Sequence, residues 1–208
     1  MKTSINLTTW PRRDHFEFFK QYDMPFFGVT AQLDCTRLYD KAKKEGFPFS
    51  AGYHFASLQA VNEVEELRYR IEDDLPVLYD AIHLSTTIAR SDGTFGFSFQ
   101  RYTEDFEQFT TEFIAEARRV QSETGLKSPY SGQDIVYYTV ARGIAFTSFD
   151  HSIMTKRQGS IPLITFGEMV QDGTRKTIAH SLHAHHALVD GMHAAKYFQA
   201  IQANLNEI

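Results

Sequence analysis

Strand-like and helix-like segments alternate along the whole 208-residue chain, with no repeat, low-complexity run or linker rich in Pro, Gly and Ser between them. Apolar positions two residues apart predict strands, and apolar positions three and four residues apart predict helices. A chain of this length is expected to fold around one core. We therefore expect residues 1–208 to form a single α+β domain, a two-layer sandwich with a mixed, mostly antiparallel β-sheet covered by helices.

Turn and cap residues set the limits of these predicted elements. Asp14 is the expected N-cap of the first helix, and Gly46-Phe47-Pro48 separates the second from the third. Asp172-Gly173 predicts a hairpin turn. The predicted helices are 14–22, 36–44, 51–64, 105–122 and 192–206; the predicted strands are 26–33, 67–71, 77–79, 82–89, 95–99, 136–140, 144–149, 161–169 and 176–186.

Composition excludes several classes of function. The net charge of −5 is opposite to that of most proteins that bind nucleic acid through phosphates, so we expect no nucleic-acid partner. No apolar stretch approaches the length of about 20 residues that crosses a bilayer, and the N-terminus lacks the apolar core of a signal peptide. We expect a cytoplasmic protein with no membrane contact. Its one cysteine, Cys35, is expected to be an inert thiol.

Aromatic residues are abundant: the chain has 18 Phe and 10 Tyr but a single Trp. So many rings predict a large core, a flat apolar pocket, or both. The phosphate-binding patterns GxGxxG and GxxxxGK[ST] do not occur, so a Rossmann or P-loop protein is not indicated.

Histidines concentrate in residues 181–193, SLHAHHALVDGMH. If residues up to 186 continue a strand, His186 lies on its apolar face, while His183 and His185 point the other way. A neutral imidazole at the end of an apolar strand can accept a proton from a bound small molecule. Two other interpretations stay open: hydrogen-bonded histidines without a chemical role, and a zinc site using His183 and His185, for which the segment offers no plain third ligand.

Residues 185–191, HHALVDG, resemble the signature of the chloramphenicol acetyltransferases, shared more loosely by other acyltransferases that use thioesters. Further segments follow in the same order as in that family, from about residue 8 to the C-terminus. These segments are residues 10–16 (WPRRDHF), 30–34 (TAQLD), 146–150 (FTSFD) and 163–165 (LIT).

The resemblance implies a role for each matching residue. His186 matches the general base that takes the proton of an acceptor hydroxyl as it attacks the acetyl thioester. Ser148 matches the donor to the oxyanion of the tetrahedral intermediate, a contribution of about 10²–10³ in rate. Asp190 matches a structural aspartate whose arginine partner is here Arg12. Without the resemblance, Ser148 would be an ordinary polar residue of a strand, and Arg12 a solvated neighbour of Arg13.

The remaining implications concern substrates and assembly. Thr165 matches a threonine that holds a water near the intermediate, and Phe27 and Phe95 fall at acceptor-pocket positions, although either would otherwise be assigned to the core. The resemblance also implies acetyl-CoA as co-substrate, no metal, and antibiotic resistance by acetylation of chloramphenicol. It further implies a homotrimer, in which His186 of one subunit faces an acceptor pocket built largely by its neighbour.

The sequence departs from the family at several contacts. Phe27 stands where a tyrosine is often found, and Ser50 replaces a tyrosine expected near the start of the predicted helix 51–64. Glu168 and Met169 stand where a lysine and a tyrosine usually lie near the coenzyme, and a carboxylate does not favour its phosphates. Two alternatives therefore stay open: the same chemistry on another hydroxyl or amine acceptor, and a non-catalytic binding or interface protein with this fold.

Overall fold

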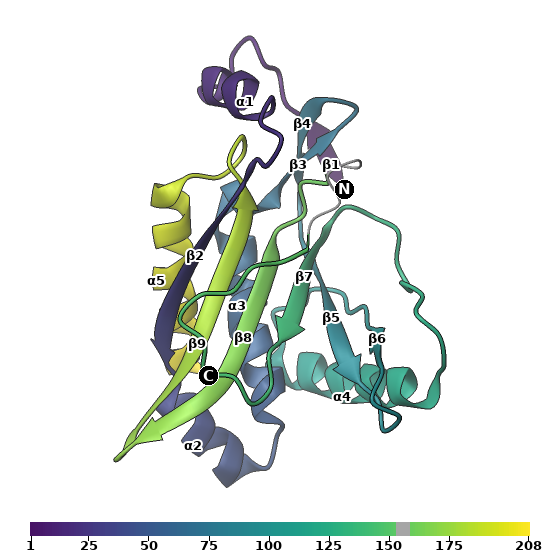
Figure 1. Ribbon diagram of the computed structural model, residues 1–208, viewed down its shortest axis with the longest axis vertical. Helices are drawn as coiled ribbons and strands as arrows, with labels where there is room; N and C mark the ends of the chain where they lie inside the picture. The colour runs from purple at the N-terminus through teal and green to yellow at the C-terminus, as the bar shows by residue number, and fades with distance from the viewer. Residues whose placement is uncertain (153–158) are drawn as a thin grey trace.

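In residues 1–152 and 159–208, which the computed structural model describes, the strands form a six-stranded and a three-stranded sheet (Figure 1). The large sheet has the order β2-β9-β8-β7-β5-β6. Strand β7 is parallel to β8 and β5, whereas the other three pairings are antiparallel. The sheet is thus mixed and mostly antiparallel, as predicted. Its strands are Phe26–Asp34 (β2), Arg175–His185 (β9), Leu163–Asp172 (β8), Ile135–Val140 (β7), His83–Ala89 (β5) and Phe95–Phe97 (β6).

Helices cover one face of this sheet. Figure 1 places α2, α3 and α5 behind β2, β9 and β8, and α4 behind the far edge. Gly46 ends α2 with a φ of 81°, which glycine adopts without strain, and Asp105 caps α4 by accepting from the Gln108 amide. The fold class predicted from sequence is confirmed. The helices are Arg13–Phe19 (α1), Thr36–Glu45 (α2), Phe49–Glu63 (α3), Phe106–Ser122 (α4) and Gly191–Glu207 (α5).

Helices α3 and α5 pack side by side on the sheet, and hydroxyl groups join both helices to its strands. Ser57 of α3 hydrogen-bonds the hydroxyls of Tyr138 on β7 (2.9 Å) and Tyr197 on α5 (2.6 Å). Tyr197 also hydrogen-bonds Nε2 of His180 on β9 at 2.8 Å. Burial lowers the pKa of His180 to about 3, so this imidazole is neutral. The network satisfies polar groups that would otherwise destabilise the core.

On the opposite face of the sheet, an irregular segment of the chain takes the place of helices. After β7, the segment that begins at residue 141 crosses in front of β8 and β9 (Figure 1). Phe146 is buried on this face, and its backbone carbonyl accepts a long hydrogen bond from Gln32 of β2. The face under this segment carries the side chains that alternate with the core residues of β8 and β9.

The small sheet, of order β1-β4-β3, lies near α1 and contains a fully buried arginine (Figure 1). Arg70 donates to the backbone carbonyls of Leu67, Tyr69, Gln133 and Ile135, at 2.6 to 2.8 Å. Burial lowers its pKa to about 9, which leaves the guanidinium charged at neutral pH. The strands are Lys2–Ser4 (β1), Leu75–Tyr79 (β4) and Tyr69–Glu72 (β3), with a 3-10 turn at Glu65–Arg68 (η1).

Several local predictions were wrong. The strand predicted at 176–186 ends at His185, so His186 lies beyond its apolar face, and the helix predicted at 14–22 ends at Phe19. Residues 144–149 were expected as a strand but are irregular, because the neighbours of β7 are already β5 and β8 and no further strand pairs here. Residues 67–68 belong to η1, so β3 begins only at Tyr69. Asp14 lies inside the first turn of α1, where a carboxylate is favourable, and Arg12 occupies the N-cap position.

The described helices include none with the length and apolar composition that a membrane span requires.

Arg70→Met tests the role of the buried arginine. The variant leaves four carbonyl groups without their donor, so we expect the free energy of unfolding to fall by about 3 kcal/mol. Urea denaturation measures the change, with Arg175→Met, at an exposed position, as the control. A loss smaller than about 1 kcal/mol would contradict this assignment.

Candidate active site

His186 lies in the turn that directly follows β9, and two backbone groups fix it. Its amide donates to the carbonyl of Pro25, the residue before β2, at 2.8 Å. Its Nδ1 lies 3.1 Å from the carbonyl oxygen of Val189. Because a carbonyl can only accept, Nδ1 carries the proton of this hydrogen bond. In the neutral ring, Nε2 is then unprotonated and free to accept a proton from a bound group.

Two phenylalanines hold the plane of the His186 ring. Phe19, at the end of α1, stacks on it with centroids 3.9 Å apart and planes 7° from parallel. Phe27 of β2 contacts it at 4.8 Å and a tilt of 43°. The imidazole is half-buried, so it is oriented by its neighbours while part of it reaches the surface. Phe19 was not among the residues predicted from the sequence, whose pattern shows only that it lies on a helix.

Asp190 fixes the other end of the turn. Its Oδ1 accepts from the amides of Met192 and His193 and so caps α5, while its Oδ2 accepts from Nη1 of Arg12 at 2.7 Å. Burial tends to raise the pKa of Asp190, but the hydrogen bond from Arg12 and the nearby positive charges outweigh it, and the pKa lies below its ordinary value. The carboxylate is therefore ionised at neutral pH. It joins the turn to the chain before α1.

His193 completes this arrangement. Its Nδ1 accepts from the Asp190 amide at 3.1 Å, in a reciprocal capping box. Its Nε2 lies 3.2 Å from the Glu66 carboxylate. Neither His193 nor Glu66 was predicted to have a role. For His193, the available signal was its spacing from Asp190 at the start of a predicted helix.

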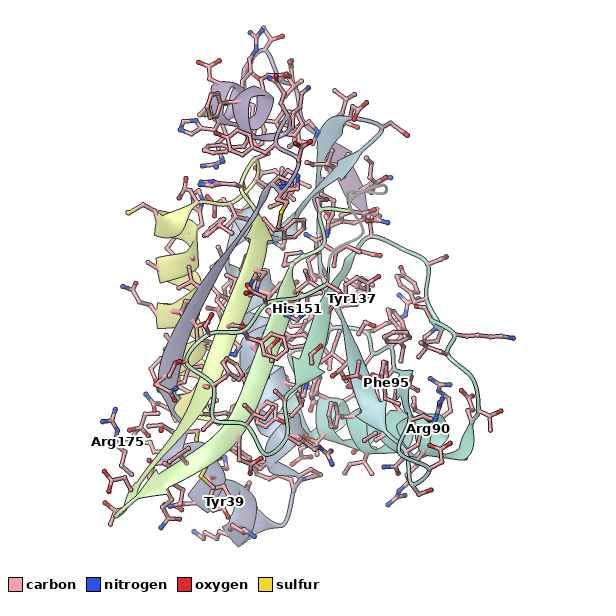
Figure 2. The ribbon with its side chains drawn as sticks, viewed as in Figure 1. Tyr39, Arg90, Phe95, Tyr137, His151 and Arg175 are labelled. Atoms are coloured by element: carbon pink, nitrogen blue, oxygen red, sulfur yellow. The ribbon has the colours of Figure 1, made fainter. Side chains whose placement is uncertain are left out.

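The other predicted site residues lie elsewhere in the chain. Thr165 is fully buried on the face of β8 away from the helices, opposite Ser181 of β9. Ser181 and His186 are five positions apart, a span of about 16 Å for extended backbone. Ser148 is exposed in the irregular segment after β7, and Phe95 is 45% exposed on the edge strand β6 (Figure 2). One copy of the chain thus joins His186, Phe27, Asp190 and Arg12, but leaves Thr165 apart from them.

Two further imidazole rings, those of His151 and His183, lie on the same face of the sheet as Thr165. His151 hydrogen-bonds the Thr165 hydroxyl through Nε2 at 2.9 Å, and its ring meets that of His183 at 5.1 Å. The His183 ring lies on Gly28 of β2, where a Cβ atom would be 2.4 Å from its Nε2. His183 is therefore held against the sheet. Sequence reasoning missed His151, although it directly follows the motif of residues 146–150.

His183 and His185, the two ligands of the hypothetical zinc site, both contact other groups. His183 Nε2 lies 3.6 Å from the Asp150 carboxylate, and His185 Nδ1 accepts from the Ala187 amide at 3.2 Å. No group of three or more metal-ligating side chains gathers within residues 1–152 and 159–208. Cys35 is fully buried, and burial raises its pKa to about 12, which disfavours the thiolate.

Glu168, one of the departures noted in the sequence, is held by the segment that crosses the sheet. Its Oε2 accepts from the Gly143 amide at 2.9 Å. The backbone carbonyl of Ser50, at the start of α3, accepts a hydrogen bond from Nδ1 of His54 at 2.8 Å. Both residues therefore have local structural partners within the chain.

Comparison with solved structures gives the class of protein. A solved chloramphenicol acetyltransferase superposes with a TM-score of 0.88 at 25% identity, over 99% of this chain and 100% of the other. A probable dihydrolipoamide acetyltransferase from Listeria monocytogenes shares the fold, with a TM-score of 0.66 at 21% identity, over 99% and 94% of the two chains. Its fold and its similarity to these structures identify the protein as an acyltransferase.

Sequence comparison is more specific. The family model named Chloramphenicol acetyltransferase matches residues 1–202. Chloramphenicol acetyltransferase 3 of Escherichia coli is 27% identical over 206 residues, which cover 98% of this chain and 97% of the relative. Chloramphenicol acetyltransferase 2 of Escherichia coli is also 27% identical, over 99% and 98% of the two chains. The chain belongs to the chloramphenicol acetyltransferase family.

Asp190→Asn tests the charge that fixes the turn. At pH 7 we expect the free energy of unfolding to fall by about 1–2 kcal/mol, since the cap and the ion pair with Arg12 both lose the carboxylate. The folded-state pKa is lowered, so this stabilisation is present above the ordinary Asp pKa of about 4 and is lost as pH falls through the folded-state value.

Thermal unfolding from pH 7 downward measures this effect, with Asp172→Asn, at an exposed hairpin position, as the control. The wild type and Asp190→Asn should differ most at pH 7 and converge in acid. A difference of the same size at every pH would rule out the charge as its cause.

Proposed function

We propose that this protein is an acetyl-CoA-dependent O-acetyltransferase that inactivates chloramphenicol by acetylating its hydroxyl. One observation carries the proposal: the Val189 carbonyl accepts a hydrogen bond from Nδ1 of His186, which leaves Nε2 as a base at a partly exposed position. Family membership and the match to the signature at residues 185–191 support the same role. We infer that residues 1–208 form a single acyltransferase domain.

The proposed reaction needs one base and one oxyanion donor. Nε2 of His186 takes the proton of the acceptor hydroxyl while its oxygen attacks the thioester carbonyl carbon of acetyl-CoA. Ser148 donates to the oxygen that becomes negative in the tetrahedral intermediate. The intermediate collapses as the carbon–sulfur bond breaks, and the imidazolium returns the proton to the leaving thiolate. The products are the acetyl ester and CoA, and neither a metal nor a covalent enzyme intermediate takes part.

We further propose that each active site is built by two copies of the chain in a homotrimer. Thr165 of β8 pairs with Ser181 of β9, about 16 Å along the strand direction from His186, which lies in the turn after β9. We therefore infer that one copy does not bring the two side chains to the same bound substrate. Large apolar side chains beside the residues that contact His186, or at the start of α5, are exposed: Phe18 (58%) precedes Phe19, Met24 (72%) precedes Pro25, and Met192 (72%) lies in the first turn of α5. Exposed apolar side chains of this kind are typical of a surface that another chain covers.

Phe27 and Phe19 give the proposed site its apolar wall beside the base. A water-poor wall matters because water competes with the acceptor as nucleophile. Thr165 and Phe95 belong, in this proposal, to the part of the acceptor pocket that the neighbouring copy supplies. A cytoplasmic location and a role in antibiotic resistance are parts of the same proposal.

A different hydroxyl or amine acceptor is the second candidate. Neither ring beside His186 carries a hydroxyl, which removes a polar contact to the acceptor. The carboxylate of Glu168 also stands where a cation would suit the coenzyme. Acetylation of another compound, with none of chloramphenicol, would select this second candidate.

The first test is thiol release from acetyl-CoA by wild type and His186→Ala, with and without chloramphenicol. We expect release by the wild type that depends on chloramphenicol, and a fall in kcat of at least about 10³-fold in the variant, because the base is gone. His83→Gln, which changes a half-buried histidine of β5, is the matched control. Substantial activity of folded His186→Ala would remove His186 from the proposed role.

A second test asks whether the site is shared between chains. His186→Ala and Ser148→Ala are each expected to be almost inactive alone. Co-expressed in equal amounts, they should recover about a quarter of the wild-type activity, because random assembly gives that share of interfaces with both native residues when the interface is heterologous.

Two controls accompany this test: sedimentation, which should give a trimer, and each variant assayed alone under the same conditions. If the mixture is no more active than its two components, the base and the oxyanion donor belong to one chain and the two-chain site is wrong.

A further inference from the structure

His151 is the one titratable side chain that contacts Thr165 by a side-chain hydrogen bond among the described residues, and the proposed reaction has so far given it no part. It follows Ser148 by three residues in the segment that crosses the sheet, and Figure 2 shows it over the face opposite the helices. Its Nε2 lies 2.9 Å from Oγ1 of Thr165, which is fully buried. One bond therefore connects the segment that carries Ser148 to strand β8.

The His151 ring is fixed on two sides. Phe149 meets it edge-on at 5.0 Å, and His183 meets it edge-on at 5.1 Å. His183 is itself held because its ring lies on Gly28, with no room for a Cβ atom there. A ring held between two others has few alternative rotamers, so the bond to Thr165 has a fixed direction.

The charge state of His151 suits a positioning function. Burial, together with the neighbouring His183, lowers the pKa of His151 to about 4, although the Asp150 carboxylate opposes the shift. At neutral pH the ring is therefore uncharged. A neutral imidazole uses one nitrogen for the Thr165 hydroxyl without placing a cation beside the acceptor pocket.

We propose that His151 is a positioning residue of the acyl-transfer site, which orients the Thr165 hydroxyl and holds Ser148 where it can meet the oxyanion. The inference rests on the proposed function of Ser148 and Thr165. The hydrogen bond uses one of the hydrogen-bonding functions of Thr165 and leaves the others for the intermediate or a bound water. Since displacements of about 1 Å in a site can cost about 10²-fold in rate, the loss of this bond is expected to lower kcat.

The test compares three variants in the thiol-release assay. His151→Leu keeps the volume but loses the bond, Thr165→Val removes the other partner, and His151→Gln keeps a side chain that can reach Thr165. We expect His151→Leu to lower kcat by about 10–100-fold with KM for acetyl-CoA changed by less than about twofold. His151→Gln should restore most of kcat, and the double variant His151→Leu/Thr165→Val should be no slower than the slower single variant.

His83→Leu and His83→Gln are the matched controls, since His83 is a half-buried histidine of β5 that accepts a hydrogen bond from the Tyr102 amide. Both should leave kcat within about twofold of the wild type. Thermal unfolding of every variant separates lost turnover from lost fold. If His151→Leu does not fold, His151→Gln and Thr165→Val still decide the matter through kcat and KM.

The outcomes are distinguishable from those that concern the proposed function. A wild type that releases no thiol with any acceptor overturns the proposed function, and this inference with it. An active wild type with normal kcat in folded His151→Leu overturns the inference alone. Equal losses in His151→Leu and His151→Gln, matched by equal losses of stability, would assign His151 to the fold rather than to the site.

Discussion

The hydrogen bond between Nδ1 of His186 and the Val189 carbonyl is the contact on which the candidate site depends. It decides which nitrogen of the neutral ring can act as a base, and it closes the turn between β9 and α5. The ring stacked on Phe19 cannot rotate away without losing that contact. The Arg12–Asp190 pair then fixes the far end of the turn and ties it to the N-terminal segment. Residues far apart in the sequence thus position one imidazole.

The central strands explain why the chemistry is divided between two faces. Antiparallel β2, β9 and β8 form a continuous surface, and alternation sends successive side chains to opposite faces. The face toward α3 and α5 carries the core, with His180 in its hydrogen-bond network. The other face carries Thr165 and His183, covered by the segment that holds Ser148 and His151. Because His186 lies in the turn after β9, about 16 Å along the strand from the level of Thr165, we propose that a neighbouring copy supplies the other half of the site.

The sequence was sufficient for the fold class because the periodic patterns of its longer elements were strong. Strand 26–33 and helix 105–122 fall within a residue of β2 and α4. Residues 144–149 show the limit: alternation predicts a strand, but a strand also needs a neighbour with free backbone groups, which a single segment does not reveal. The pairing of Arg12 with Asp190 was reachable only through the family resemblance.

Other parts of the site could not be predicted from one sequence. Phe19 and His151 act through contacts made by tertiary packing, and nothing local distinguishes a ring that stacks on an imidazole from a ring in the core. The roles of His186, Ser148 and Thr165 still rest on the resemblance and on geometry, and so they remain predictions. For His186, the structure adds a physical reason: the Val189 carbonyl selects the tautomer in which Nε2 can act as a base.

The tautomer of His186 is therefore the property to measure first. Long-range ¹H–¹⁵N NMR correlation on protein labelled at histidine distinguishes a protonated Nδ1 from a protonated Nε2 near neutral pH. The account predicts a proton on Nδ1 and a bare Nε2 in the neutral ring. A neutral ring that carries its proton on Nε2 would contradict it, because the nitrogen assigned as the base would then have no lone pair to offer.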